Sequence, residues 1–340
     1  MALSAGKGTQ YMVLDMSSSN LKLAVGSYNN KTGVVSIEKV GVVPLELDSI
    51  NDGQIADSFG INMALKHAWA KLGINAKNCI ITTEGSFMHT RDLEIPQVGA
   101  NQIGDMVKFE LMGQSNSKEM SVDYIVYGDA VDEETNAKKL KVRATAAPTE
   151  TVVAFRDFIK DMEKNPVALD TNQNAVRKLF NGSIINGNVN VAQATILLIE
   201  LSSTTTTVTI LDKGFPILTR RLNITKSDSE MSVDPSEIDL WHESLADTPA
   251  LQSAANAYFK SLTDAVSRTA QFAISKFHID SISTCFLYGS GSGYKKIDKE
   301  LSSQLSTQVE TLNTISTVNG PRDFMLPQFV NCCGALIRND

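Results

Sequence analysis

The chain has 340 residues, and its 31 lysines and arginines against 38 aspartates and glutamates leave a formal net charge of -7. A chain of this length usually divides into two domains or lobes, and its 42% hydrophobic and 20% charged residues exclude a disordered protein. The acidic balance, with no cluster of basic residues, argues against nucleic acid as the main partner.

Membrane insertion and metal clusters are also not expected. No stretch approaches the roughly 20 apolar residues that span a bilayer, and the first ten residues lack the apolar core of a signal peptide. The four cysteines (Cys79, Cys285, Cys332 and Cys333) form no Cys-x-x-Cys pair, and the four histidines have no ligand spacing. We therefore expect a cytosolic protein with reduced thiols and no zinc site.

The first predicted elements form a three-stranded meander. An apolar run over 11–14 is followed by the alternating Leu21, Leu23 and Val25, and then by a third strand at Val34–Val43 after an Asn-Asn-Lys-Thr-Gly turn. The next part of the chain is mixed. Helical periodicity predicts helices near 58–72, 103–112, 149–162 and 172–180, and apolar runs predict strands near 79–83, 87–95, 124–127, 140–147 and 167–169.

The meander pattern returns in the second half of the chain. Strands are predicted at 194–201, 205–211 and Phe215–Leu222, with an Asp-Lys-Gly turn before the last of them. The Asn- and Gly-rich loop 181–190 separates the two copies. This repeat predicts two related lobes, each of which opens with its own β-meander.

The remaining residues complete the second lobe. The acidic stretch 223–249 predicts a solvated loop in preference to a recognition surface. A long helix over 251–277 and a strand over 283–288 follow, and the strand runs into the flexible turn Gly-Ser-Gly-Ser-Gly at 289–293. A helix, a strand and a helix are predicted from there to the end.

In both meanders a carboxylate closes the first strand and a hydroxyl-rich turn follows it. Asp15 precedes Ser17, Ser18, Ser19 and Asn20, and Glu200 precedes Ser202, Ser203, Thr204 and Thr205. The N–H and hydroxyl groups of such turns can hold phosphate oxygens, and the carboxylates can hold Mg²⁺ through water. Lys22 could add a positive charge, and the glycines near 289 permit close approach to a base or ribose.

These motifs carry a resemblance to a known family. The segment DMSSSNLKL at 15–23 resembles the phosphate-1 loop of the actin, Hsp70 and sugar kinase superfamily, and most closely its form in PilM proteins of type IV pilus machines. LIELSSTTTT at 198–207 is similar to the phosphate-2 loop, and LYGSG at 287–291 looks like the adenosine loop. QIAD at 54–57, TRDLEIP at 90–96 and VKFE at 107–110 also resemble PilM, so the likeness covers nearly the whole chain.

The resemblance implies an α/β, actin-like ATPase fold with two lobes, each built on a ribonuclease H-like meander with flanking helices. It implies a first lobe at 1–190 with a subdomain inserted at about 56–146, and a second lobe at 191–322 with an insertion at about 223–278. A C-terminal helix at 323–340 would return to the first lobe. The implied nucleotide site comprises Asp15, Ser17, Ser18, Ser19, Asn20, Lys22, Glu200, Ser202, Ser203, Thr204, Thr205, Gly289, Ser290, Gly291 and Ser292, with Asp15 and Glu200 at Mg²⁺.

Departures from the family pattern weaken the case for catalysis. Ser17 and Ser202 stand where the family usually has glycine, and Glu200 stands for an aspartate. A Cβ at either serine could displace phosphate or forbid a backbone angle that glycine allows. The resemblance therefore implies a scaffold with at most weak ATPase activity, and it leaves ATP and Mg²⁺ binding open.

The leading functional hypothesis is a scaffold at the cytoplasmic side of the inner membrane. By resemblance, it binds the N-terminal cytoplasmic tail of a PilN-type membrane protein and links it to other pilus motor components. The tail would lie in a groove of the inserted subdomain, where apolar anchors are typical of peptide recognition. The candidate groove residues, which would otherwise be subdomain core, are Phe87, Phe109, Leu111, Met112, Tyr124 and Tyr127.

Two alternatives stay open from the sequence. The first is a kinase or ATPase of the same superfamily, for which Asp170 is the candidate base, although Asp170 could instead cap the helix that begins near Asn172. The second is an FtsA-like filament former, which would be favoured by a membrane-binding C-terminal helix that is not visible here. Homo-oligomer formation is open for all three hypotheses.

Overall fold

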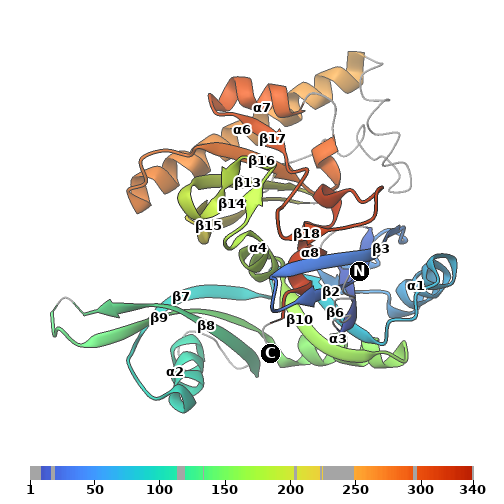
Figure 1. Ribbon diagram of the computed structural model, residues 1–340, viewed down its shortest axis with the longest axis horizontal. Coiled ribbons are helices and arrows are strands. Elements are labelled where there is room, and N and C mark those ends of the chain that lie inside the picture. The colour runs from blue at the N-terminus through green and yellow to red at the C-terminus, as the bar shows by residue number, and fades with distance from the viewer. Residues whose placement is uncertain are drawn as a thin grey trace, which may run out of the picture. The chain divides into compact units, whose positions relative to one another are not determined.

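The computed structural model describes residues 9–16, 20–112, 119–132, 134–202, 205–222, 224, 249–293 and 297–338. Contacts divide the chain into two compact units. The larger unit comprises Met1–Thr83 and Glu163–Asp340, and the smaller unit comprises Glu84–Met162. Figure 1 colours the elements along the chain, and each unit is described separately below.

The first meander of the larger unit lies at the centre of a six-stranded sheet. β1 (Gln10–Asp15), β2 (Leu21–Asn29) and β3 (Val34–Val43) are antiparallel, and β6 (Asn78–Thr83) and then β10 (Asn165–Thr171) extend the sheet in parallel from β1. β18 (Val318–Asn319) adds to the far edge. The helix α1 (Ser58–Leu72) packs near β3 and is capped by Asp57, whose side chain accepts the Gly60 N–H.

The second meander repeats this arrangement. β13 (Thr195–Leu201), β14 (Thr206–Asp212) and β15 (Phe215–Leu222) are antiparallel, and β16 (Thr284–Tyr288) and β17 (Val309–Thr311) continue in parallel from β13. The helices α6 (Pro249–Phe277) and α7 (Ile297–Leu305) cover this sheet through a core that includes Leu262, Val266 and Leu301. The predicted repeat of two meanders is therefore present in the fold.

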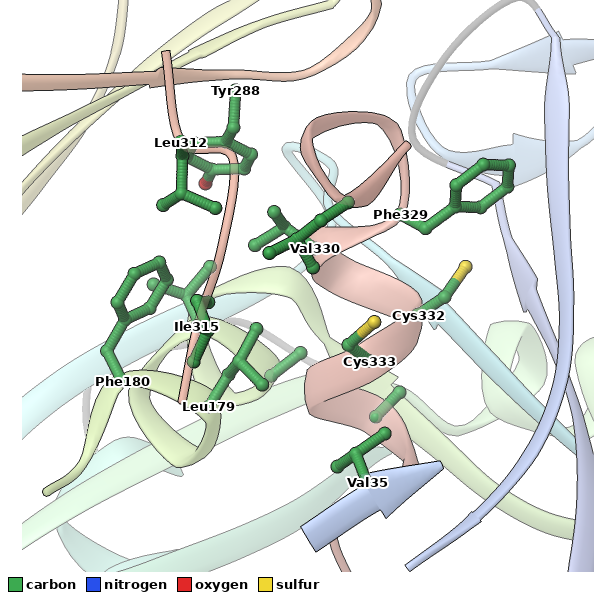
Figure 2. Close-up of a cluster of buried hydrophobic side chains, with 14 of the residues drawn as sticks. Val35, Leu179, Phe180, Tyr288, Leu312, Ile315, Phe329, Val330, Cys332 and Cys333 are labelled. Carbon is green, nitrogen blue, oxygen red and sulfur yellow. The ribbon is translucent and has the colours of Figure 1, made fainter. Parts of the chain in front are cut away.

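Two short helices and one apolar core join the two sheets of the larger unit. α4 (Asn172–Phe180) and α8 (Val330–Leu336) pack against each other, and their core also takes Val13 from the first sheet and Leu198 from the second. All seven residues of α8 are buried. Figure 2 shows Cys333 on the side of α8 that faces Leu179 of α4, and Cys332 on the opposite side of the helix. The sheets are thus joined by the C-terminal segment of the chain.

The short elements of the larger unit lie in its connections. They are β4 (Ile50–Asn51), β5 (Gln54–Ile55), β11 (Ile184–Ile185), β12 (Val189–Asn190), η1 (Val191–Gln193), η3 (Ser290–Gly293) and η4 (Leu326–Gln328). Two of them correct the sequence prediction. The loop 181–190 contains the β11–β12 hairpin, and the turn expected to be flexible at 289–293 is a 3-10 helix.

The smaller unit is a three-stranded antiparallel sheet with two helices. Its strands are β7 (His89–Pro96), β9 (Lys138–Pro148) and β8 (Met120–Val131), with β9 in the middle. The helix α2 (Ala100–Met112) packs on β8 and β7, and α3 (Thr149–Asp161) packs on β9 and β8. Alternate residues of β9, namely Leu140, Val142 and Ala144, face the core beneath α2.

The predicted acidic loop at 223–249 lies outside the described residues, except for positions 224 and 249. In the part of the chain that the structure describes, no helix is both long and apolar enough to cross a membrane.

Candidate functional site

The carboxylates that close β1 and β13 lie at one buried spot between the two sheets. Asp15 is 1% exposed and Glu200 is 5% exposed. The side-chain nitrogen Nδ2 of Asn331, which is on α8, donates to Oδ2 of Asp15 at 3.2 Å and to Oε1 of Glu200 at 2.7 Å. The two halves of the chain therefore bring their strand-closing carboxylates to the same nitrogen atom.

Two further side chains complete this cluster. Lys22 is paired with Asp15 in the β1–β2 register, and its Nζ lies 3.8 Å from Oδ2 of Asp15. The Tyr288 hydroxyl at the end of β16 donates to Oε2 of Glu200 at 3.4 Å. Two carboxylates and one ammonium would leave one formal negative charge in a buried place, which is unfavourable in a low-dielectric interior.

The protonation of Glu200 responds to this environment. Burial raises the pKa of the Glu200 carboxyl above its ordinary value, and the neighbouring Asp15 carboxylate adds to that rise. Lys22 and the hydrogen bonds from Asn331 and Tyr288 lower the same pKa, but burial is the largest cause. The fold therefore favours the neutral form of Glu200 relative to an exposed glutamate.

The turns that follow the two carboxylates are only partly described. Ser17, Ser18, Ser19, Ser203 and Thr204 lie outside the described residues. Asn20 is buried at the start of β2. The Ser202 N–H donates to the Thr205 carbonyl oxygen at 2.9 Å, and the Thr205 N–H donates to the Ser202 hydroxyl at 3.1 Å. These two bonds close the second turn on itself.

The glycine-rich turn after β16 packs against the end of β13. Gly289 has a φ of +89°, and a Cβ added there would lie 2.4 Å from the Leu201 carbonyl oxygen. A Cβ added at Gly291 would lie 3.0 Å from the Leu201 Cβ, and the Ser292 hydroxyl donates to the Gly289 carbonyl oxygen at 2.8 Å. The absence of a side chain at these glycines therefore allows the turn to approach Leu201 of the same chain closely.

The described residues do not fit a hydrated Mg²⁺ with a nucleotide. Mg²⁺ keeps several waters in an octahedral shell and needs open space beside its carboxylates. Here both carboxylates are buried, and an amide group lies between them. Among the described residues no three histidine, cysteine, aspartate or glutamate side chains gather where they could share a metal ion.

Comparison with known proteins places this architecture in a family. A family model described as type IV pilus assembly protein PilM matches residues 13–329. The chain belongs to the PilM family.

Solved structures agree on the fold of this PilM-family chain. A chain of the PilM-PilN type IV pilus biogenesis complex matches with a TM-score of 0.78 and 16% identity, over 96% of this chain and 97% of that chain. The ethanolamine utilization protein EutJ from Carboxydothermus hydrogenoformans matches with a TM-score of 0.51 and 11% identity, over 96% of this chain and 89% of that chain. The fold is the actin-like ATPase fold that the sequence predicted.

Asp170, the candidate catalytic base of the enzyme hypothesis, is held in a structural network. Its Oδ1 accepts the Thr171 N–H at 2.9 Å and the Asn174 side-chain N–H at 2.8 Å. Its Oδ2 accepts from Lys178 at 2.6 Å, and Lys178 also donates to the Ile337 carbonyl oxygen at 2.8 Å. The N-cap of α4 is Thr171, so Asp170 ties α4 to the end of the PilM-family chain and does not itself cap the helix.

The candidate groove residues of the smaller unit differ in exposure. Phe87 is buried and stacks on Phe155 with 6.4 Å between ring centroids, so it is core. Leu111 and Tyr124 are partly buried against the core under α2. The Arg143 guanidinium lies 5.9 Å from the Tyr127 ring centroid. Phe109 is 78% exposed, and the side chain of Met112 lies outside the described part of the chain.

The sequence reading did not identify Asn331. Its side chain reaches Asp15 across 316 positions of the chain, and no local motif marks that contact. One signal was available: Asn331 is a polar residue inside the apolar run FVNCCGAL at 329–336, and a buried polar side chain requires a partner.

Proposed function

We propose that this chain is a cytoplasmic scaffold of a type IV pilus platform, peripheral to the inner membrane, that binds the cytoplasmic tail of a PilN-type membrane protein. Membership of the PilM family supports the proposal, and so does the likeness to a chain of a complex that contains PilN. The buried carboxylate cluster supports a binding role over a catalytic one, because neither carboxylate is accessible to a substrate. The proposal does not require a nucleotide. We also expect contacts with other components of the pilus motor.

The surface around Phe109 is the proposed docking place for the tail. Phe109 lies on α2 and is 78% exposed, and Val126, on the adjacent strand β8, is 45% exposed. An exposed phenylalanine of this kind is a typical anchor for an amphipathic peptide, because its burial on binding removes a large apolar area from water. Gly104 supports this surface from within: a Cβ there would lie 3.6 Å from the Tyr124 ring. The Tyr124 ring therefore packs directly under α2.

A pair of matched phenylalanine variants tests this proposal. Phe109→Ala removes the proposed anchor, and Phe59→Ala is the control, because Phe59 on α1 is 77% exposed in the other unit. The probe is a fluorescent synthetic peptide of the N-terminal cytoplasmic segment of the PilN-type protein from the same organism. Both variants should keep the wild-type unfolding temperature, since truncation of an exposed side chain changes stability by about 0.5 kcal/mol or less.

We expect Phe109→Ala to weaken peptide binding about tenfold or more, which is the effect of an interface hot spot, and Phe59→Ala to leave binding unchanged. Equal binding by wild type and Phe109→Ala would reject α2 as the docking place. No binding by the wild-type chain well above about micromolar concentration, where such peptides usually bind, would reject the scaffold proposal itself.

A further inference from the structure

Asn331 is chemically matched to the two carboxylates that it joins. An amide nitrogen carries two N–H groups, and here one points to Asp15 and the other to Glu200. The remaining polar atom, Oδ1 of Asn331, is buried and has no hydrogen-bond partner in the described part of the structure. An unpaired buried carbonyl is unfavourable, so the two donated bonds are what hold the side chain in this orientation.

The place that the amide occupies needs an electropositive group. Two carboxylates that approach one atom repel each other in a buried site unless a proton, a cation or a donor lies between them. Lys22 reaches Asp15 from the side of β2, and Tyr288 reaches Glu200 from β16. The Asn331 nitrogen contacts both carboxylates, so it has the position that a bridging cation would take.

An ion pair also joins the two sheets of the larger unit, at a place away from Asn331. Arg221, at the end of β15 in the second sheet, forms an ion pair with Asp52 at 2.6 Å. Asp52 lies in the turn between β4 and β5, and this turn is tied to the first sheet by the Thr83 hydroxyl, which donates to the Gly53 carbonyl oxygen at 2.7 Å. The two sheets are therefore joined by an inner polar contact at Asn331 and by an outer one at Arg221.

We propose that Asn331 is a built-in substitute for a bridging metal ion: its amide joins Asp15 to Glu200 and holds the two sheets together without nucleotide or cation. The proposal goes beyond the scaffold function and does not depend on the identity of the partner. Its consequence is that the association of the two sheets does not depend on a bound ligand.

The first test uses the wild-type chain. We expect its thermal unfolding temperature to change by less than about 1 °C on addition of about 5 mM Mg²⁺, Mn²⁺ or Mg²⁺ with ATP, because a ligand stabilises a fold only if it binds the native state. A rise of several degrees that needs both Mg²⁺ and ATP would overturn the proposal, since the site would then accept the ligand with Asn331 present.

The second test converts the amide into a metal ligand. Asn331→Asp places a third carboxylate between Asp15 and Glu200, so we expect a lower unfolding temperature in EDTA and recovery of at least half of the loss with Mn²⁺ or Mg²⁺. Asn172→Asp is the matched control, because Asn172 is also a buried asparagine of the larger unit, and its Oδ1 accepts from the Thr82 hydroxyl at 2.8 Å. The control should be insensitive to cations.

Absence of cation rescue in a folded Asn331→Asp would contradict the proposed position of the amide. If Asn331→Asp does not fold, a double-mutant cycle of Asn331→Ala with Glu200→Gln decides the question. Coupling between the two substitutions supports the contact, and strict additivity of their effects on the unfolding temperature would overturn it.

Discussion

Gly334 sets how closely α4 and α8 approach, and the substitution Gly334→Ala tests this crossing. A Cβ at position 334 would lie 2.1 Å from the Ala175 carbonyl oxygen and 2.4 Å from the Ala175 carbonyl carbon. These atoms belong to the backbone of α4 and cannot rotate away as a side chain could. The two helices would have to move apart, and α8 also carries Asn331 one turn earlier.

The net cost follows from two opposing effects. Overpacking a buried site usually costs 1–3 kcal/mol, and contact with rigid backbone places this site at about 3 kcal/mol. Alanine is favoured over glycine inside a helix by about 1 kcal/mol, which offsets part of that cost. We therefore expect Gly334→Ala to lower the free energy of unfolding by about 2 kcal/mol, which for a chain of 340 residues corresponds to a fall of roughly 3 °C in the unfolding temperature.

The assay is urea denaturation followed by circular dichroism, with Gly104→Ala as the control. Gly104 also lies within a helix, but the nearest atom to an added Cβ is the Tyr124 Cε1 at 3.6 Å, an ordinary van der Waals distance. Gly104→Ala should therefore gain up to about 1 kcal/mol. If Gly334→Ala is as stable as the wild type, the close crossing of α4 and α8 is wrong.

Three further predictions concern the buried cluster and its surroundings. Burial raises the folded-state pKa of Glu200 above its ordinary value of 4.5, so the native state binds more protons than the unfolded state between the two pKa values. As the pH rises through this range the wild type should lose up to about 1.4 kcal/mol of stability per pH unit, and Glu200→Gln should remove this loss. A stability difference between the two proteins that does not depend on pH would contradict this. Gly289→Ala should be far more destabilising than Gly182→Ala, since both glycines have positive φ but only Gly289 would place its Cβ against backbone; equal unfolding temperatures would refute the contact with Leu201. Arg221→Gln should cost about 1 kcal/mol or less by denaturation, and the cost should vanish at about 1 M salt because the ion pair is partly exposed.

Elements with local signals at both ends could be predicted from the sequence. Predicted and observed bounds agree for Val34–Val43, Phe215–Leu222 and Asn172–Phe180. A glycine-containing turn precedes each of the two strands, and the Thr171 side chain caps the helix. The repeat of two meanders followed from strand and turn signals of this kind, whereas the actin-like fold was implied by the resemblance to the PilM family, and the structural likeness confirms it.

Features that depend on distant packing could not be predicted in this way. The helix expected over 323–340 spans only Val330–Leu336, because Pro327 lies in the 3-10 turn η4 just before it. Phe87 was a candidate for a groove but is buried, because it stacks on Phe155 from a later helix. The contact of Phe87 with Phe155 joins residues that no local pattern relates, whereas Pro327 is a local signal that the prediction of the longer helix did not use.

The buried cluster is built by the two meanders together with the C-terminal helix α8. The two meanders still aim their carboxylates at one spot, which requires only strand length and sheet packing. The side chain between the two carboxylates, Asn331, comes from a different element, the helix α8. The position of α8 is set by the close approach of Gly334 to α4 and by the hydrogen bond from Lys178 to the Ile337 carbonyl oxygen. Lys22 contacts Asp15, Tyr288 contacts Glu200, and Asn331 of this helix contacts both carboxylates. Under our proposal, this last contact joins the two sheets in the place of a ligand.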